Sequence, residues 1–434
     1  MNNNGILTLL QTRRFLPLFI CQALSAFKHN FLRTLLVAIV TFKSLGLSDL
    51  SRSILVSLSF GITNLPYILF SATAGELADK YNKAKLIQIS KILDFALTFI
   101  VIIGIYVSNY TLILLIAFLI SFEATVMGPV KYSILPEHLN IDELIIGNGL
   151  IEASTFLAIL LGIIFGGMVP SDDHITIFIL LFTTAAVAYI VSLFIPSTSP
   201  AVPNLKIDLN IFTRSLKIIG LANKDPFIYK LIIVISWFWL EGGIFLAQLP
   251  NFTKDVLGAD KTVFVLLITI FTCGVAIGSL ICYKILKHQT QIKYSFYSLF
   301  ISSMLLGVLC YITNYLPLQN SSINLTSFIS LLAGMAISVL LFFVAIFYGI
   351  FIVPIYVLLQ IRAENNERSR IIAANNIINA IFIAIGSLVS TALIFIGVSV
   401  TNIFWLLIAA NMLIIWYGLK LAQVPNTEKR VINA

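Results

Sequence analysis

The chain has 434 residues, of which 59% are hydrophobic and only 11% are charged, and its mean hydropathy is +1.01. A soluble globular protein does not need that much apolar surface, so the composition excludes that class. The formal net charge of +8, from 27 Lys and Arg against 19 Asp and Glu, would suit nucleic-acid binding. The basic residues, however, fall mainly between long apolar runs, which indicates a membrane protein instead.

The apolar residues form continuous runs and do not alternate with polar ones, which favours helices over a transmembrane barrel. A bilayer core of about 30 Å takes about 20 helical residues. We therefore predict an all-α membrane protein with twelve transmembrane helices. The predicted spans are residues 15–42, 52–75, 84–107, 110–128, 147–169, 174–196, 228–249, 262–284, 294–312, 334–360, 371–397 and 400–420.

The basic residues are distributed unevenly between the two sides that these spans define. With the N-terminus inside, 20 of the 27 Lys and Arg fall in predicted cytoplasmic segments. Loops rich in Lys and Arg tend to stay in the cytoplasm, so we expect a multi-pass protein with both termini cytoplasmic. The predicted outer loops contain Lys43, Arg52, Lys254 and Lys261.

The chain is expected to divide into an N-terminal six-helix bundle (1-195), a cytoplasmic linker (196-227) and a C-terminal six-helix bundle (228-434). In the linker an apolar stripe repeats at helical spacing with basic residues beside it, which predicts an amphipathic helix on the inner leaflet. The stripe consists of Leu209, Phe212, Leu216 and Ile219, and the basic residues are Arg214 and Lys217.

Ionisable residues interrupt the first span near its middle. Each of them costs about 2–3 kcal/mol there, even on the mild insertion scale. His29 and Arg33 are four residues apart and share a helix face, whereas Lys28 lies about 100° away. One interpretation is a structural ion pair with another helix, and the other is a cavity wall that attracts an anionic group such as a phosphate. The candidate substrate-binding residues in this span are Lys28, His29, Asn30 and Arg33.

Further charges lie in and beside the next spans. Lys91 and Asp94 are three residues apart on one helix face, where they could form an intrahelical pair. Gly128 and Pro129 are expected to break the fourth span near the cytoplasmic surface, and the fifth span is expected to begin at Gly147. The candidate substrate-binding residues in this region are Glu123, Lys131 and Glu152.

The second half contains further polar residues within apolar runs. Trp237 and Glu241 in the seventh span are candidate substrate-binding residues. The run that ends at residue 360 is too long for one upright span, so we assign residues 322–333 to an outer interfacial segment. Asn375 and Asn379 share a helix face, and interhelical hydrogen bonds would be sufficient to explain them.

A short charged turn, residues 75–86, joins the second and third spans. Gly75 is the small residue that closely packed helices need there. Asp79 can sit near a helix N-terminus, whose N–H groups favour an anion, and could pair with a basic residue across a cytoplasmic gate. Alternatively, the lysines could hold an ordinary loop on the cytoplasmic side. The candidate gating residues are Gly75, Asp79, Lys80, Lys83, Lys85, Arg368, Arg370, Asn375, Asn376 and Asn379.

The order G-x-L-A-D-K-x-x-K-x-K in this turn resembles the loop between helices 2 and 3 of the major facilitator superfamily, with Asn82 where that pattern usually has Gly. Residues 278–284 are a faint copy of this turn at the corresponding place in the second half. The copy supports two parallel six-helix repeats. Several blocks resemble one branch, the bacterial lysophospholipid transporters, although the chain has His29 where that branch usually has Asp. The blocks are residues 71–86, 128–136, 147–162, 236–252 and 352–379.

The resemblance implies a major facilitator fold in the bacterial cytoplasmic (inner) membrane and no cofactor. It also implies a secondary transporter that flips lysophospholipids, such as lysophosphatidylethanolamine, from the outer to the inner leaflet by alternating access. Relatives of this branch occur fused ahead of an acyltransferase and an acyl-carrier-protein synthetase, so a cytoplasmic acyltransferase/acyl-ACP synthetase is a candidate partner. Lysophospholipids and membrane lipids are the other expected partners, and nucleic acid is not.

Two other functions remain open at this point. A proton-coupled exporter of amphipathic small molecules would use the same fold and would require a proton gradient. A membrane-embedded acyltransferase would need a nucleophile or an acid–base pair. The sequence has no Walker loop, no His followed five residues later by Asp, no Ser–His–Asp arrangement and no metal-ligand cluster, so we expect no enzyme activity.

Overall fold

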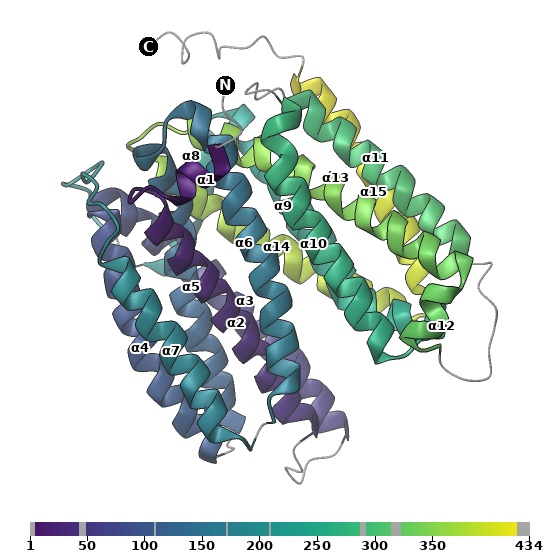
Figure 1. Ribbon diagram of the computed structural model, residues 1–434. Helices are drawn as coiled ribbons and strands as arrows, with labels where there is room; N and C mark the ends of the chain where they lie inside the picture. Colours follow the sequence, from purple (N-terminus) through teal and green to yellow (C-terminus); the bar gives the residue numbers. More distant parts are fainter. Residues whose placement is uncertain are drawn as a thin grey trace.

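The computed structural model describes residues 5–42, 49–107, 110–170, 172–207, 210–286, 292–313 and 323–422. Lys43, which was assigned to an outer loop, and the cytoplasmic cations Lys287, Lys429 and Arg430 lie outside these ranges. Each predicted span corresponds to one long helix in the described part of the chain (Figure 1). These helices are α2 (Leu16–Phe42), α3 (Asp49–Lys80), α4 (Lys83–Val107), α5 (Tyr110–His138), α6 (Ile141–Met168), α7 (His174–Ser192), α9 (Pro226–Asn251), α10 (Lys261–Leu286), α11 (Ile292–Ile312), α13 (Leu332–Arg362), α14 (Arg368–Phe395) and α15 (Val400–Ala422).

The composition of these helices suits a bilayer. Among the described residues, ten helices are long and apolar enough to cross a membrane, namely α4 to α7, α9 to α11 and α13 to α15. Helices α2 and α3 are of similar length, with 27 and 32 residues. The described residues contain no β-strand and only one isolated β-bridge, between Ala259 and Ile323. The all-α prediction is therefore confirmed.

Short helices connect or precede the long ones. They are α1 (Gly5–Leu10), α8 (Ile211–Ala222), the π-helical turn η1 (Phe252–Val256) and α12 (Leu325–Ser330). Helix α12 lies in the segment that we assigned to the membrane interface, and it begins where the Asn324 side chain accepts a hydrogen bond from the Ser327 N–H at 2.9 Å. The long apolar run is thus divided between α12 and α13, as its length indicated.

Two predicted helix ends are wrong. Helix α5 continues through Pro129 and Pro136 to His138, because membrane helices tolerate proline. Gly128 lies against the Asn376 side chain of α14, so its small size serves a close helix contact. Helix α6 begins at Ile141, six residues before the predicted start, because the Glu143 carboxylate accepts the Asn140 N–H at 2.9 Å and caps the first turn.

Helices α2–α7 form the first group of helices, on one side of the molecule (Figure 1). Helices α9–α15 form the second group on the other side, and α14 is the member that lies nearest the first group in this view. The two groups touch closely at glycines. A Cβ atom at Gly75 of α3 would lie 2.6 Å from Cβ of Ala373 in α14, and one at Gly149 of α6 would lie 2.5 Å from the Ser279 carbonyl oxygen of α10. These contacts lie toward the face where α1 begins and α15 ends, so the two groups are closed against each other there (Figure 1).

Substituting Gly149 tests this closed face. We expect Gly149→Leu to force α6 away from α10, since the added atoms meet backbone. The variant should therefore melt below the wild type in detergent. Gly167→Leu on the same helix is the control, because nothing lies within 4 Å of a Cβ there. Equal melting temperatures of the two variants would contradict the expectation.

Helix α8 joins the two groups and binds α3 through a charge. Arg214 is only 1% exposed, and its guanidinium lies 2.8 Å from the Glu76 carboxylate and 3.0 Å from the Thr73 hydroxyl. Leu216 of the apolar stripe is 72% exposed. The amphipathic helix therefore turns one basic side chain into the protein and leaves this apolar side chain outside. The stripe residue Leu209 and the side chain of Phe212 lie outside the described part.

Candidate functional site

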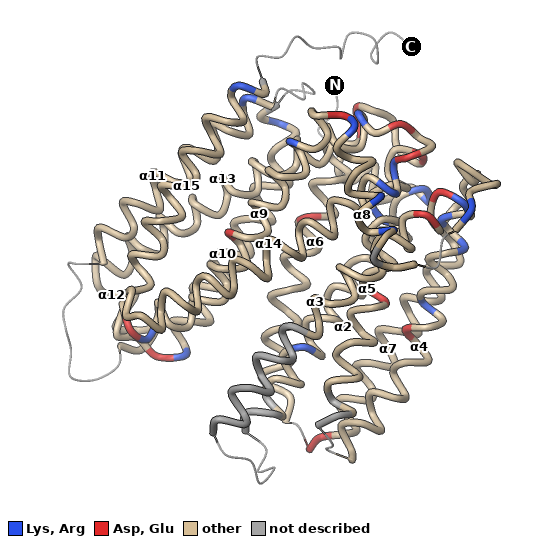
Figure 2. Tube along the Cα trace, turned by 180° about the vertical axis from the view of Figure 1, so that it is seen from behind, with Lys and Arg blue, Asp and Glu red and all other residues tan. Residues whose placement is uncertain are grey.

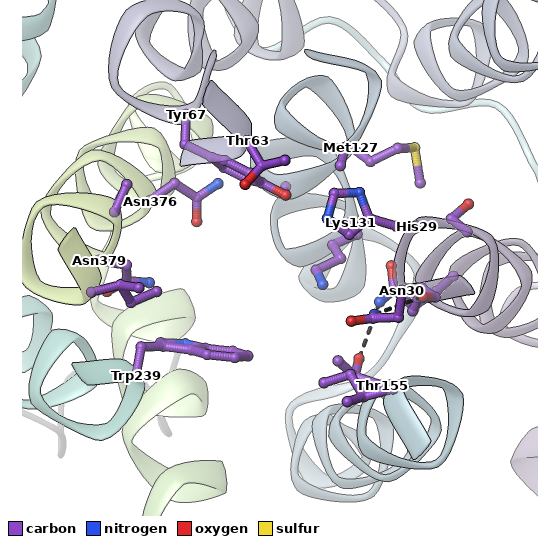
Figure 3. Close-up of a pocket in the computed structure, with 18 of the residues that line it drawn as sticks. His29, Asn30, Thr63, Tyr67, Met127, Lys131, Thr155, Trp239, Asn376 and Asn379 are labelled. Carbon is purple, nitrogen blue, oxygen red and sulfur yellow. Dashed lines mark hydrogen bonds between the residues drawn. The ribbon is translucent and has the colours of Figure 1, made fainter. Parts of the chain in front are cut away.

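A cavity of ≈ 280 Å³ lies between the two groups of helices. Figure 3 shows His29, Asn30, Lys131 and Thr155 on one side of it and Trp239, Asn376 and Asn379 on the other. The residues that line the cavity are Gln22, Ser25, Ala26, His29, Asn30, Arg33, Thr63, Asn64, Tyr67, Ala124, Met127, Gly128, Lys131, Tyr132, Thr155, Ile159, Trp239, Tyr356, Asn376, Asn379, Ala380 and Ile383.

The ionisable side chains on this wall, apart from tyrosine, are basic. His29 and Arg33 project from α2 and Lys131 from α5, and no Asp or Glu lines the cavity within the described residues. The Lys131 ammonium lies 4.7 Å from the centre of the Tyr132 ring. The Nδ1 atom of His29 is buried and has no hydrogen-bond partner in the structure. The shared helix face predicted for His29 and Arg33 does face a cavity, and its chemistry suits an anion.

Amide and aromatic side chains complete the wall. Asn30, Asn376 and Asn379 are sequence candidates that reach it, and the Asn379 carbonyl also accepts the Ser236 hydroxyl at 2.7 Å. The Trp239 indole N–H donates to the Tyr356 hydroxyl at 2.8 Å, which fixes the ring at the cavity edge. Sequence reasoning did not select Trp239 or Tyr356. Wall residues thus offer donors for an anion together with flat apolar surfaces.

Lys28 does not reach the cavity. Its ammonium donates to the Asp94 carboxylate at 2.7 Å and to the Thr98 hydroxyl at 2.8 Å, both on α4. The side chain is nearly fully buried, because it lies on a different face of α2 from His29. For Lys28, the interpretation as a structural ion pair is the one that the geometry supports.

A second buried pair lies beside the first. The Lys91 ammonium of α4 donates to the Glu123 carboxylate of α5 at 2.6 Å and to the Ser25 hydroxyl at 2.6 Å. Lys91 and Asp94 therefore bind partners on other helices, and the interpretation as an intrahelical pair is wrong. Glu123 is held by Lys91 and does not line the cavity. Helices α2, α4 and α5 are joined through these two pairs.

Glu152 lies behind the wall at the closed side of the cavity. It is fully buried in α6, and one of its carboxylate oxygens accepts the hydroxyl of Tyr132. The Tyr132 ring in turn stacks on Tyr356 of α13, with centroids 4.6 Å apart and planes inclined by 8°. This stack joins the two groups of helices, so Glu152 positions a residue of the floor and does not itself line the cavity.

Trp237 and Glu241 lie inside the second group of helices and not in the cavity. The Trp237 indole donates to the Asn411 carbonyl at 2.7 Å, and the Asn411 amide donates to Glu241 at 2.9 Å. The Tyr348 hydroxyl lies 3.1 Å from Glu241 and 2.8 Å from the Phe238 carbonyl oxygen. Positions 237 and 239 are about 200° apart around a helix, so only one of the two tryptophans can face the cavity.

A neutral side chain at position 241 would satisfy these bonds. In Glu241→Gln the amide can donate to the Tyr348 oxygen while its carbonyl accepts from Asn411, so we expect an unchanged melting temperature. Glu241→Leu leaves the buried Asn411 amide without that acceptor and should lower the free energy of unfolding by about 1–3 kcal/mol. Thermal unfolding of both variants in detergent measures the difference. Equal destabilisation of the two variants would contradict this account.

The charged turn binds the other group of helices through Asp79. Its fully buried carboxylate accepts the Arg370 guanidinium at 2.9 Å and the Ser369 N–H at 3.1 Å, in the first turn of α14. The predicted pairing with Arg370 and the placement at a helix N-terminus are both found. Arg368 instead donates to the Gln360 carbonyl at 3.0 Å and to the Asn365 side chain. Asp79 thus joins α3 to α14 at the closed face.

The remaining gating candidates have different surroundings. Lys83 is buried and pairs with Glu137 at 2.5 Å within the first group of helices. Lys85 is exposed, and Lys80 lies 5.6 Å from the centre of the Tyr81 ring. Asn375 is fully buried and does not line the cavity. Among the gating candidates of the turn, Gly75 and Asp79 contact α14 directly.

Comparisons with known proteins agree on the architecture. The family model of the Major Facilitator Superfamily matches residues 18–339. A bacterial homologue of the iron transporter ferroportin in an outward-facing state has a TM-score of 0.69 and 12% identity, covering 94% of this chain and 98% of that chain. The E. coli fucose:proton symporter FucP has the same score and identity, covering 95% and 100%. At these identities the likeness shows the fold alone.

Curated relatives match part of the chain. The lysophospholipid transporter LplT of Salmonella schwarzengrund (strain CVM19633) is 32% identical over 209 residues, which is 48% of this chain and 49% of the relative. The protein of the same name from Salmonella typhimurium (strain LT2) matches with the same identity and coverage. The match thus spans about half the length of these relatives.

Proposed function

The chain belongs to the Major Facilitator Superfamily, and from this premise we propose that it is a secondary transporter that moves lysophospholipids from the outer to the inner leaflet of a bacterial cytoplasmic membrane. Residues 1-195 and 228-434 would rock as two bundles about the cavity, with residues 196–227 as the linker. The substrate would be a lysophospholipid, a class to which lysophosphatidylethanolamine belongs. A cytoplasmic acyltransferase would consume the product.

The observation that carries this proposal is the pairing of basic and aromatic side chains in one cavity between the two groups of helices. Lys131 and Arg33 can bind a head-group phosphate through charge-assisted hydrogen bonds. Trp239 and Ile383 on the other side offer apolar surface to the chain of the lipid. The Salmonella relatives named as lysophospholipid transporters favour this substrate class over other anions.

The distribution of charge is what supports alternating access. Charged residues gather at the end of the molecule where α8 lies (Figure 2). That distribution, with the excess of basic residues in the predicted inner segments, favours this end as the cytoplasmic one. The Asp79–Arg370 pair and the Tyr132–Tyr356 stack join the two groups of helices. On this proposal the structure would represent an outward-facing state, in which the cavity would receive a lipid from the outer leaflet.

Uptake of labelled lysophosphatidylethanolamine into sealed proteoliposomes tests the proposal. We expect protein-dependent uptake without ATP, measured against vesicles that lack the protein. Uptake only in the presence of a proton gradient, together with efflux of cationic amphiphiles, would favour the exporter. Formation of an acylated product in detergent, where there is no compartment, would favour the acyltransferase. Absence of uptake for every lysophospholipid tested would contradict the proposal.

A further inference from the structure

The charges around the cavity are arranged in two layers. The inner layer, which a ligand would touch, contains Arg33, Lys131 and His29 as its ionisable groups other than tyrosine. The acids Asp94 and Glu123 do not line the cavity, and each is paired with a lysine that does not line it either. Asp94 binds Lys28, and Glu123 binds Lys91. Within the described residues, no carboxylate lines the space that a head group would enter.

Glu152 lies behind the floor and is not part of the wall. Its carboxylate is fully buried, and one oxygen accepts the Tyr132 hydroxyl. The Tyr132 ring stacks on Tyr356 of α13. The charge of Lys131 interacts with this acid, so Glu152 already has a cationic partner when a head group enters.

A zwitterionic head group would therefore meet an unfavourable wall. Its phosphate would bind Lys131 or Arg33, and its ammonium, a few atoms away, would lie among cations without a carboxylate to accept it. Like charges at such distances repel strongly in a partly buried site. A head group of glycerol, or a phosphate monoester, brings the same phosphate together with hydroxyl or further phosphate oxygens. The amides of Asn30, Asn376 and Asn379 can hydrogen-bond to those oxygens.

We infer that this cavity selects lysophospholipids whose head group is anionic and lacks an ammonium, and that His29 is a residue that sets this preference. The inference rests on the proposed function and specifies its head group. His29 can do this because its ring lies on the wall of the cavity, beside Asn30 and opposite Asn379 (Figure 3). It shares a face of α2 with the cation Arg33, so a change of charge at position 29 acts on the same space.

The test is a comparison of uptake in proteoliposomes of lysophosphatidylglycerol, lysophosphatidate and lysophosphatidylethanolamine with the same acyl chain. We expect the wild-type protein to take up either anionic lipid with a kcat/KM about tenfold higher than that for lysophosphatidylethanolamine. His29→Asp places a carboxylate on the wall and should reduce or reverse this ratio, whereas the neutral His29→Asn should fall between. Asn204→Asp, which adds the same charge at an exposed linker position, should keep the wild-type ratio.

The outcomes separate the two proposals. If no lysophospholipid enters the vesicles, the transport function itself is wrong. If lysophosphatidylethanolamine enters as well as the anionic lipids, or better, transport stands and the head-group inference is overturned. A wild-type preference for anionic lipids that His29→Asp leaves unchanged would overturn the role of His29. The wild-type ratio needs no variant, so the inference stays testable if a substitution prevents folding.

Discussion

Replacing Lys131 with Met should lower lysophospholipid uptake by about 10- to 100-fold. Lys131 is a cation on the cavity wall, where its ammonium lies over the Tyr132 ring and its charge interacts with the buried Glu152. A hydrogen bond between a charged donor and a phosphate contributes about 1.5–3 kcal/mol, and each 1.4 kcal/mol is a factor of about ten. Initial rates of uptake over a range of lipid concentrations measure the loss.

Two matched variants make this result specific. Lys131→Arg keeps the charge and should retain most of the uptake, whereas Lys224→Met removes an exposed lysine of the linker and should leave uptake unchanged. Lys131→Met also leaves the buried Glu152 carboxylate without the cation that interacts with it, so it should melt below the wild type, whereas Lys131→Arg should not. Wild-type uptake in a well-folded Lys131→Met protein would remove this residue from the phosphate site.

The helices could be predicted because their signal is local. A run of about 20 apolar residues identifies a span wherever its neighbours lie, so each of the twelve runs corresponds to a helix. The ends were wrong where one residue type serves two purposes. Gly128 permits the approach of Asn376 and does not end α5, and Glu143 caps α6 earlier than the apolar pattern begins. Sequence spacing alone does not distinguish these uses.

Partners of buried charges could not be predicted from spacing, because they depend on how neighbouring helices rotate. Lys91 and Asp94 suit an intrahelical pair, yet each faces a different helix and finds an opposite charge there. The same limit applies to Trp237, whose helix turns it toward Asn411 while Trp239 faces the cavity. His29 and Arg33 were identified with the correct face because their spacing of four residues is itself a property of one helix.

Breaking the Lys28–Asp94 pair should be the most destabilising of the changes considered. Lys28→Leu leaves the Asp94 carboxylate buried without its cation, and Asp94→Leu strands the ammonium, which bonds to Asp94 at 2.7 Å. Removing one partner of a buried ion pair typically costs about 3–5 kcal/mol. We expect each single variant to melt well below the wild type in detergent and to accumulate poorly in the membrane.

The double variant Lys28→Leu/Asp94→Leu separates a structural role of the pair from a role in transport. It buries no lone charge, and replacing a buried pair by apolar side chains is often neutral, so its melting temperature should recover toward that of the wild type. Because neither residue lines the cavity, uptake should recover with stability. A double variant that is stable and yet inactive would mean that these charges take part in the transport cycle, for example by exchanging partners as the two groups of helices move.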